Sequence, residues 1–417
     1  MLVPKPLRRV ALAALFAVLL VSWHVGHHHR LPDFKEIRHN YPMLLKYIEG
    51  KKGNGGAWHF PQEWSPDSTA TTNPPLTIIG AAALAQNITS QPQRQLPHSA
   101  IPRIIHQTWK DTRLETWPAT FRDSAEKWLA VVDEGEMAYM FWDDAGVAQF
   151  IRYFEPNLEA EFYALPTKVE QSDVFRVLVC KWLGGVYVDM DTEPRQSPMD
   201  WISNLDIAPW TDLQTGRTYH SSEPVRAVVG IEADNPPDTD TYWRMGYFYP
   251  VQLTQWAFAW APQHPILTDF INHIFDTVRK IADRHDGDLH NELTQEELRY
   301  IDPVNVTGPI AFTDSVSAWL SGKADLRWNA VTGLKDGGRS KFVEDVLVLP
   351  ITGFSPGRGK YGNMGSKPIT DPAARLYHHA EGSWRKISIS VELGKFCRSA
   401  FGLCRDWSKV SNGGFFS

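Results

Sequence analysis

The stretch from Ser172 to Pro194, SDVFRVLVCKWLGGVYVDMDTEP, decides the fold of this chain. Its first half is an apolar helical segment that ends at Gly184-Gly185, and the residues Val186 to Val188 then favour a buried strand because they are β-branched or aromatic. Asp189 and Asp191 follow at the exit of that strand. The stretch therefore predicts a helix, a glycine break and a buried strand that ends in two carboxylates.

The two aspartates suit a divalent cation. Two anions this close repel each other unless one is protonated or a cation bridges them, and hard carboxylate oxygens are preferred ligands of Mg²⁺ and Mn²⁺. These ions also bind phosphate oxygens, so the pair can hold a diphosphate through one metal. Two aspartates separated by one residue also occur in ordinary surface turns. The buried strand before Asp189 and Asp191 favours the metal site, of Mn²⁺ or Mg²⁺.

The helix before the aspartates carries two charges that its surroundings do not explain. Apolar residues cover most of its circumference, and they are Val174, Phe175, Leu178, Val179 and Trp182. Asp173 and Arg176 lie three residues apart, on one face of this helix. They form either an internal ion pair of little consequence or a polar clamp for sugar hydroxyls. Their place beside the metal-binding turn favours the clamp.

Composition places the chain among globular proteins and excludes one class of partner. It has 417 residues, of which 43% are apolar and 12% aromatic, enough for a large core. The formal net charge of −6 and the absence of a long basic run exclude nucleic acid as a partner.

From Ile101 onward, strand and helix patterns alternate, which predicts an α/β fold with a largely parallel sheet. The first strand is expected at Ile101 to His106, with Trp109 at its exit. Ligands gather at the carboxyl ends of strands in open sheets. Trp109 is therefore either a stacking surface for a nucleobase or a core residue.

The N-terminus predicts a membrane anchor. Lys5, Arg8 and Arg9 precede an apolar run from Val10 to Val21. A cleaved signal peptide would end in small residues, which Ser22-Trp23-His24-Val25 does not provide. Positive charge before the run favours an uncleaved anchor with its N-terminus in the cytoplasm, which is type II topology.

Residues 27–97 resemble a spacer, because glycine and proline interrupt every long periodic pattern. We therefore expect a cytoplasmic tail at 1–9, a transmembrane signal anchor at 10–26, a luminal stem at 27–97, a folded domain at 98–390 and a C-terminal tail at 391–417.

Two further features fit an oxidising, luminal compartment. Asn87 and Asn305 begin N-glycosylation triplets, and we expect Asn87 to be the more accessible, with Asn305 buried before the Gly308-Pro309 turn. Cys397 and Cys404 have a spacing compatible with a small disulfide loop, although sequence alone does not show that they approach each other. Cys180 is expected to be a buried apolar side chain.

Six motifs together resemble one family. They are IIHQTWK at 104–110, SDVFR at 172–176, GGVYVDMD at 184–191, GIEAD at 230–234, TGP at 307–309 and HHAEGSW at 378–384. In this order they resemble glycosyltransferase family 32, and within it the fungal initiation-specific α-1,6-mannosyltransferases of the Golgi. The resemblance covers residues 102–386. It implies a GT-A fold, with a Rossmann-like nucleotide-binding half, for the catalytic domain at 98–390.

The resemblance also implies roles at the donor site. It places Trp109 against the nucleotide base and Asp173 and Arg176 on the donor sugar. Asp189 and Asp191 would hold the metal and the diphosphate.

At the C-terminal motif, the resemblance implies that His379 is a metal ligand, with Glu381 as its rival. Ser383 and Trp384 would contact the diphosphate, and Lys386 would help to neutralise the leaving group. The expected catalytic residues are Asp173, Arg176, Asp189, Asp191 and Trp384.

The reaction implied is retaining transfer of mannose from GDP-mannose to an N-glycan or mannan acceptor, through front-face departure and attack, in the Golgi membrane. Glu232, Asp234, Gln255 and Trp256 are candidates for contact with the acceptor.

Other functions remain open at this point. The acceptor could be inositol-phosphoceramide, although the chain has no second apolar run long enough to span a membrane. A metal-dependent phosphoesterase would use more His and Asp ligands than one pair. A catalytically silent subunit of a mannan-building complex would have lost part of the donor motifs, which are all present.

Overall fold

The computed structural model describes residues 31–50, 52–64, 75–135, 137–301, 303–358, 364–382 and 389–404. A ten-stranded mixed sheet forms its centre, in the order β1-β2-β4-β3-β5-β11-β9-β13-β12, with β10 paired to β9. The strands of this sheet are β1 (Lys52–Gly53), β2 (Gly56–His59), β3 (Ile104–Thr108), β4 (Ala138–Trp142), β5 (Gly185–Val188), β9 (Ala227–Asp234), β10 (Val251–Leu253), β11 (Ala257–Trp260), β12 (Lys341–Val343) and β13 (Val346–Leu349). Two small sheets pair β6 (Thr192–Pro194) with β14 (Leu376–His378) and β7 (Trp210–Thr211) with β8 (Thr218–Tyr219).

Strands β4, β3 and β5 are parallel neighbours at the centre of the sheet. Strand β11 runs antiparallel to both β5 and β9, and β13 is parallel to β9. One reversed strand therefore separates two parallel groups that run in the same direction. The expected α/β class is confirmed, with parallel strands at the centre of a mixed sheet.

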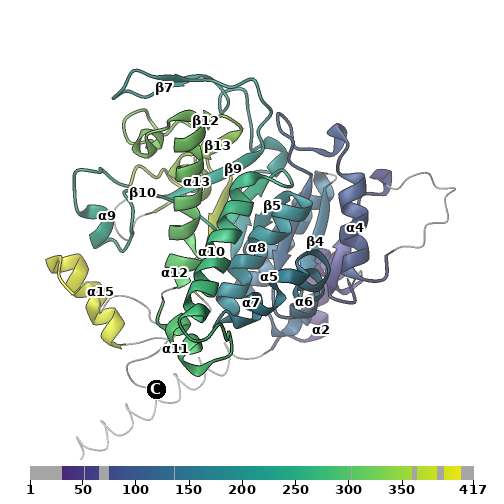
Figure 1. Cartoon of the computed structure of the whole chain (residues 1–417). Coiled ribbons are helices and arrows are strands. Elements are labelled where there is room, and N and C mark those ends of the chain that lie inside the picture. Colours follow the sequence, from purple (N-terminus) through teal and green to yellow (C-terminus); the bar gives the residue numbers. More distant parts are fainter. Residues whose placement is uncertain are drawn as a thin grey trace, which may run out of the picture.

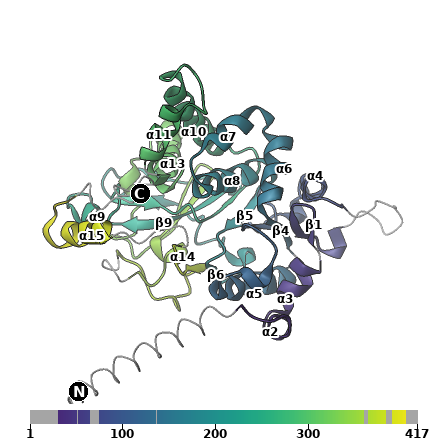
Figure 2. The same ribbon diagram turned by 90° about the horizontal axis from the view of Figure 1, so that it is seen from below.

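Helices cover both faces of the sheet (Figures 1 and 2). The helices are α2 (Phe34–Asn40), α3 (Pro42–Leu44), α4 (Ile78–Ile88), α5 (Ala119–Glu134), α6 (Asp144–Phe154), α7 (Glu159–Ala164), α8 (Lys168–Leu183), α9 (Thr241–Arg244), α10 (Pro265–Asp283), α11 (Glu292–Tyr300), α12 (Pro303–Val306), α13 (Pro309–Ala324), α14 (Ile351–Phe354) and α15 (Ile389–Phe401). Helices α4, α6, α8, α10 and α13 share one apolar core with the sheet, and α3, α5 and α14 share a second core on its opposite face. The molecule is thus a three-layer α/β structure.

The long buried helix α8 begins and ends at local sequence features. Thr167 accepts a hydrogen bond from the backbone N–H of Glu170, whose carboxylate in turn accepts from the backbone N–H of Thr167, so both ends of a capping box are present. The helix ends at Gly184, whose φ of 65° is unfavourable for a residue with a side chain. A Cβ there would also lie 2.7 Å from Cδ of Pro262. The glycine break predicted from the sequence is therefore required by both backbone conformation and packing.

His106 on β3 fixes this break from the neighbouring strand. Its Nε2 lies 2.9 Å from the carbonyl oxygen of Gly184, and its Nδ1 lies 3.4 Å from Nε1 of Trp142. Burial lowers the pKa of His106 to about 4, so the ring is neutral, donates from Nε2 and accepts at Nδ1. The start of β5 is thereby held to β3, and the carboxylates at the other end of β5 acquire a fixed position.

The expected stem at 27–97 is wrong for the part of it that the structure describes. Strand β2 pairs antiparallel with β4 over four residues, from Gly56 opposite Trp142 to His59 opposite Tyr139. Helix α4 is buried against the core along its apolar face, and the backbone N–H groups of Met43 and Leu44 bind the carboxylate of Glu126 on α5. Pairing with β4, about eighty residues further along the chain, stabilises β2 although glycines and prolines interrupt the periodic pattern of its segment. Residues from α2 onward therefore belong to the folded domain.

The expected cytoplasmic tail and anchor, residues 1–26, lie outside the described residues. Within the described residues, no helix combines the length and apolarity that crossing a bilayer requires.

The cysteines follow the expectation. Cys397 and Cys404 form a disulfide with their Cα atoms 5.9 Å apart, and Cys180 is a buried free thiol. Asn87 is exposed on α4, as expected, but Asn305 on α12 is exposed as well, so its expected burial is wrong. The buried residue of that triplet is Thr307, at the end of the helix.

Candidate active site

A cavity of about 600 Å³ opens at the carboxyl ends of β3 and β5. The residues around it that the sequence analysis named are Trp109, Asp173, Arg176, Asp189, Asp191, Glu232, Gln255 and Trp256. His378, Ala380 and Gly382 of the C-terminal motif also line it. The TGP motif contributes Gly308 and Pro309. All six motifs that define the resemblance therefore meet at this cavity.

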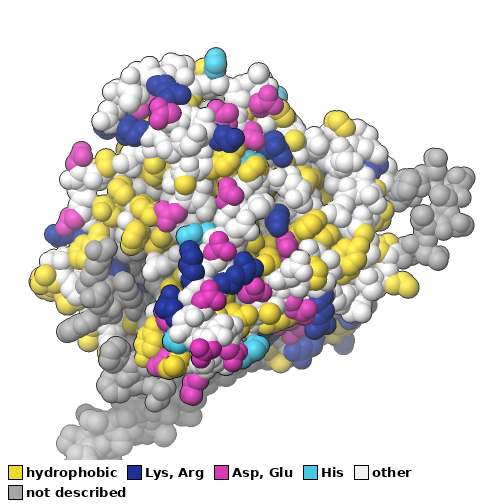
Figure 3. All heavy atoms as spheres, in the orientation of Figure 1, with side chains coloured by type: hydrophobic (Ala, Val, Ile, Leu, Met, Phe, Trp, Pro, Cys, Tyr) yellow, Lys and Arg dark blue, Asp and Glu magenta, His cyan; other side chains and the backbone are white. Residues whose placement is uncertain are grey.

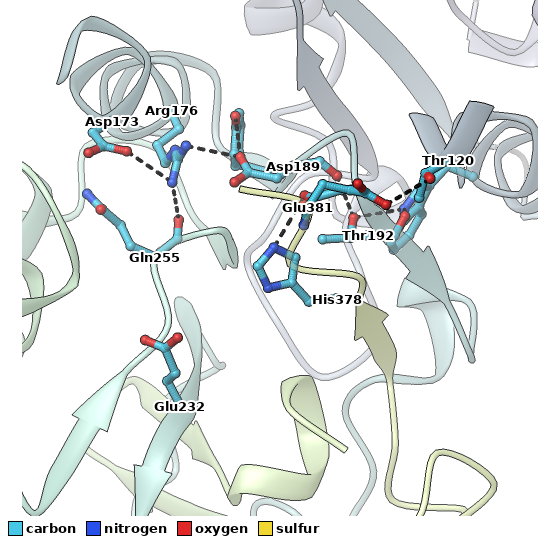
Figure 4. A network of polar contacts seen from close by, with 12 residues as sticks. Thr120, Asp173, Arg176, Asp189, Thr192, Glu232, Gln255, His378 and Glu381 are labelled. Atoms are coloured by element: carbon cyan, nitrogen blue, oxygen red, sulfur yellow. Dashed lines mark hydrogen bonds and ion pairs between the residues drawn. The ribbon is translucent and has the colours of Figure 1, made fainter. Parts of the chain in front are cut away.

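Arg176 lies between two carboxylates at the inner wall of this cavity (Figure 4). Its Nη1 is 3.3 Å from Oδ1 of Asp173, and its Nη2 is 3.1 Å from Oδ1 of Asp189. Nη1 also donates to the backbone carbonyl of Gln255 over 3.3 Å. One cation thus holds together helix α8, the end of β5 and the turn before β11.

Burial shifts the pKa values of all three charged groups. It raises the pKa of Asp173 to about 7, against the opposing effect of Arg176. Burial also raises the pKa of Asp189, again partly offset by Arg176. For Arg176, burial lowers the pKa, but Asp189 and Tyr187 raise it more, so the guanidinium remains charged. The cluster therefore depends on Arg176 as its source of positive charge.

Tyr187 orients Asp189 from the same strand. Its hydroxyl donates to Oδ1 of Asp189 over 2.9 Å, and its ring lies 5.2 Å below the guanidinium of Arg176. The backbone N–H of Asp189 donates to the carbonyl of Trp256 over 2.9 Å. The carboxylate is thus fixed through both its side chain and its backbone.

Asp191 has a different set of partners. Nε2 of His378 is 3.3 Å from its Oδ1, and the backbone N–H of Glu381 donates to its Oδ2 over 3.0 Å. Burial raises the pKa of Asp191. These contacts, led by the hydrogen bond of His378, lower it by more than burial raises it, so the pKa lies below the usual range. Asp191 is therefore ionised at neutral pH.

His378 is the residue that sequence reasoning missed. Its ring stacks on Trp256 with centroids 4.2 Å apart and planes 22° from parallel, while Nε2 points to Asp191. It stands opposite Thr192 in the β14–β6 pair, whereas Tyr377 stands opposite Glu193. Successive residues of a strand face opposite sides, so the register decides which histidine reaches the cavity.

His379, the histidine expected to bind metal, lies on the other side. Its Nε2 is 3.4 Å from Oε2 of Glu193, and its ring contacts Tyr377 edge-on with centroids 4.9 Å apart. Its rival Glu381 turns its carboxylate to α5, where it accepts from the hydroxyl of Thr120 over 2.9 Å. In this structure neither side chain points to Asp189 and Asp191. The expected assignment of a third metal ligand to His379 or Glu381 is therefore corrected.

Trp109 lies at the exit of β3, as expected. Its ring meets Phe121 edge-on with centroids 4.7 Å apart and also lines the cavity, so it is both a core residue and a cavity wall. Ser383, Trp384 and Lys386 lie outside the described residues.

The candidates for acceptor contact separate into two groups. Glu232 lines the cavity, where Nη2 of Arg358 is 3.2 Å from its Oε1, and Gln255 donates to the carbonyl of Thr307. Asp234 lies at the far end of β9 and accepts hydrogen bonds from Thr332 and from the N–H of Gly333, so it is not part of the cavity.

Thr307 is a second residue whose role the sequence did not reveal. Its hydroxyl donates to Oδ2 of Asp173 over 3.1 Å. The TGP motif thus contacts the Asp173–Arg176 ion pair through its first residue.

The residues present fit a divalent cation with a polar ligand. Asp189 and Asp191 supply oxygen donors at one wall, although the described residues contain no group of three His, Cys, Asp or Glu arranged around a metal. Around the same cavity, four buried polar atoms make no hydrogen bond within the described part: Nε of Arg176, Nε1 of Trp109, Nε1 of Trp256 and Oε1 of Gln255. Buried polar atoms are nearly always paired, so these atoms indicate a missing polar ligand. Mg²⁺ and Mn²⁺ commonly take one or two carboxylates and complete their shell with phosphate and water.

Comparison with known proteins agrees with this geometry. Residues 118–207, which include both aspartates, match the family described as glycosyltransferase sugar-binding region containing DXD motif. The chain is 31% identical to an initiation-specific α-1,6-mannosyltransferase of Schizosaccharomyces pombe over 294 residues, which cover 69% of this chain and 65% of that protein. It is 31% identical to the protein of that name in Candida albicans, over 55% of this chain and 57% of the relative. The chain thus spans less than two thirds of the length of these two relatives.

A shorter match and a structural one complete the comparison. An inositol phosphoceramide mannosyltransferase of Schizosaccharomyces pombe is 31% identical over 98 residues, 22% of this chain and 25% of that protein. The solved structure of the PaToxG glycosyltransferase covers 59% of this chain and 81% of its own at 14% identity, with a TM-score of 0.29, too low for the likeness to define the fold.

Residues 118–207 match the family of glycosyltransferase sugar-binding regions that contain a DXD motif, and the chain as a whole is similar to glycosyltransferases of family 32. Within that family it is similar to the fungal initiation-specific α-1,6-mannosyltransferases.

Proposed function

We propose that this protein is a metal-dependent, retaining mannosyltransferase. It transfers mannose from GDP-mannose to a glycan acceptor through an α-1,6 linkage. The observation that carries the proposal is the cavity in which Asp173, Arg176, Asp189 and Asp191 converge at the carboxyl end of β5. The similarity to α-1,6-mannosyltransferases over 69% of the chain supports the choice of sugar and linkage.

Asp189 and Asp191 would hold Mn²⁺ or Mg²⁺, which supplies positive charge to the diphosphate of the donor when bound. Arg176 and Asp173 would bind the hydroxyls of the donor sugar, because both residues line the cavity. Trp109 lies directly after β3 and would contact the guanine base.

The acceptor enters on the opposite wall. Glu232 presents a carboxylate that Arg358 holds in place, and Trp256, whose ring stacks on His378, also lines the cavity. Carboxylates and aromatic rings suit a sugar because they bind its hydroxyls and its apolar face, respectively. A glycan acceptor is favoured over a ceramide because the match to the inositol phosphoceramide enzyme covers only 22% of the chain.

Retention requires that the new bond form on the face from which the diphosphate leaves. Asp173 is engaged by Arg176 and Thr307, so it is a poor covalent nucleophile, and front-face attack by the acceptor hydroxyl is the mechanism we favour. Arg176 neutralises Asp189 in the ground state and gives the sugar a fixed orientation. Trapping a mannosyl-enzyme adduct would contradict this mechanism.

The fold and location complete the proposal. We propose a GT-A catalytic domain, supported by the single reversed strand β11 between parallel groups. We also propose a single-pass type II anchor in the Golgi membrane, with the catalytic domain in the lumen, and association with other mannosyltransferases there. The apolar run at 10–21 and the disulfide support a secretory location.

The experiment that tests the activity is a panel of nucleotide sugars, each incubated with the full chain and Mn²⁺ while release of the nucleotide is measured. We expect hydrolysis of GDP-mannose, loss of nearly all of it in Asp191→Asn, and normal hydrolysis in the control Asp276→Asn, whose carboxylate is exposed on α10. Equal hydrolysis by Asp191→Asn and the native protein would refute the proposal.

A further inference from the structure

Helix α15 exposes its apolar side. Ile389, Leu393 and Phe396 recur at the spacing of one helix face and are 78%, 62% and 64% exposed. Phe401 and Leu403, which follow directly, are each 64% exposed. Apolar side chains reach the surface at the left edge of the molecule in Figure 3, where this helix lies. Contiguous exposure of this kind marks an interaction surface.

The opposite side of α15 faces the protein through polar and small residues. Nε of Arg398 donates to the backbone carbonyl of Arg244 over 3.3 Å, and Gly394 is the buried residue of the helix. A Cβ on Gly246 would lie 2.7 Å from Nη2 of Arg398, so that side chain covers the glycine closely. A helix on the surface of a soluble protein turns its apolar face inward. Helix α15 is oriented the other way round.

The disulfide keeps the apolar residues after the helix beside it. Cys404 is bonded back to Cys397, in the last turns of α15. The chain that carries Phe401 and Leu403 is therefore tied to the helix end, and the rings of Phe396 and Phe401 contact each other with centroids 6.1 Å apart. The exposed apolar surface is a constrained unit, not a frayed terminus.

Charge identifies what this surface contacts. From Arg385 to the C-terminus the sequence has six Lys and Arg residues against two Asp and Glu residues, in a chain whose net charge is −6. An amphipathic helix with large apolar residues, within a basic stretch of sequence, is typical of a segment that lies in the interface of an anionic bilayer. A second copy of the same surface is disfavoured because it would bring two positively charged segments together.

The position of the surface agrees with a membrane. The folded domain begins at α2, and only seven residues, 27–33, separate that helix from the proposed anchor, a reach of about 25 Å at most. Figure 1 shows α15 at the lower left and α2 at the lower right of the molecule, both away from β7 at the top. Because the described residues between 33 and 97 are folded into the domain and do not act as a spacer, a bilayer at the proposed anchor would lie next to this lower side.

We propose that α15 is a second membrane-binding element, whose apolar face, defined by Ile389, Leu393, Phe396, Phe401 and Leu403, inserts into the interface of an anionic bilayer. The distance argument rests on the proposed anchor, whereas the apolar face and its charge do not. The contact would hold the cavity in a fixed orientation above the lipid surface.

The test is depth-dependent fluorescence quenching in the full chain. Cys180 is buried and Cys397 is bonded to Cys404, so a cysteine introduced as Leu393→Cys can be labelled alone with an environment-sensitive dye. The control is Leu213→Cys, which is 72% exposed on the β7–β8 hairpin. The labelled proteins are reconstituted into vesicles of phosphatidylcholine and phosphatidylserine that contain a lipid with a nitroxide in its acyl chain.

We expect the dye at position 393 to lose most of its emission to the nitroxide lipid, while the dye at 213 keeps it. Quenching at 393 should fall when phosphatidylserine is omitted. Emission at 393 that is insensitive to the nitroxide would overturn the proposal. Emission that changes only with the number of protein molecules per vesicle would also overturn it, in favour of a protein partner. Sedimentation of the same samples with the vesicles tests the proposed anchor separately. Hydrogen exchange of residues 389–401 in the unlabelled protein provides a check free of the dye. Exchange should be slower in vesicles if the proposal holds, and unchanged exchange would contradict it.

Discussion

Replacing Arg176 by methionine tests the electrostatic core of the site. The side chains of Arg176 and Asp173 are each 10% exposed and that of Asp189 is 24% exposed, so removing the guanidinium leaves two carboxylates without their cation in a poorly hydrated place. Removing one partner of a buried ion pair costs about 3–5 kcal/mol. Methionine preserves much of the side-chain volume, so the loss reports the charge and not a cavity. We expect Arg176→Met to lose about 3 kcal/mol at pH 7, at the low end because the carboxyls can take up protons.

The loss should depend on pH with a definite sign. The folded-state pKa of Asp173 is already about 7, above its ordinary value of 3.8, and without Arg176 it rises further. The folded protein then binds more protons than the unfolded chain, so its unfolding free energy falls as the pH rises from about 4 through 7. Arg176→Met should therefore be closest to the native protein near pH 4 and furthest from it above pH 7.

The assay is urea denaturation followed by tryptophan fluorescence, at several pH values. The matched control is Arg279→Met: Arg279 also contacts two carboxylates, Glu161 at 2.9 Å and Asp276 at 3.3 Å, but is 45% exposed. Exposed pairs are worth about 1 kcal/mol or less. Adding Asp173→Asn to Arg176→Met should restore part of the stability, because one unpaired charge is removed. Equal losses in Arg176→Met and Arg279→Met would refute the reasoning.

Three further predictions follow from individual contacts. His378→Ala should weaken Mn²⁺ binding in the presence of GDP by about 10-fold or more, because it removes the partner of Asp191, whereas His379→Ala should leave the affinity unchanged. Calorimetric titration measures both affinities. A larger loss in His379→Ala than in His378→Ala would restore His379 as the ligand. Glu232→Gln should raise the KM for the acceptor by about 10-fold, from the loss of a charged hydrogen bond, with donor hydrolysis unchanged; a fall in both rates would place Glu232 at the donor instead. Burial raises the pKa of Asp234 to about 6, so folding favours its protonated form. The free energy of unfolding should therefore fall by up to about 3 kcal/mol as the pH rises from 4 to 6. Asp234→Asn should abolish this pH dependence, and a pH dependence that persists in the variant would belong to another group.

Local sequence was sufficient to predict the centre of the fold. The apolar helix and the Gly184-Gly185 break are formed by neighbours in the chain, and together they place Asp189 and Asp191 at the end of β5. The ion pair of Asp173 and Arg176 was predictable for the same reason, since helical spacing puts them on one face.

Features that depend on pairing between distant strands were not predictable. Strand β2 has a short, glycine-rich sequence of its own and is stabilised by β4, so residues 27–97 were mistaken for a spacer. The choice between His378 and His379 needed the register of β14 on β6, which sets which of two adjacent side chains faces the cavity. Thr307 and Arg358 reach the site from segments more than one hundred residues from their partners.

The central claim is that Asp189 and Asp191 hold one divalent cation together with the diphosphate of a nucleotide sugar. The most direct measurement is anomalous scattering at the manganese edge from crystals grown with Mn²⁺ and GDP. Our account predicts one strong peak within ligand distance of both carboxylates, in contact with the diphosphate oxygens and beside the ring of His378. A GDP molecule bound in the cavity with no manganese near this pair, or a manganese peak elsewhere in the molecule, would contradict it.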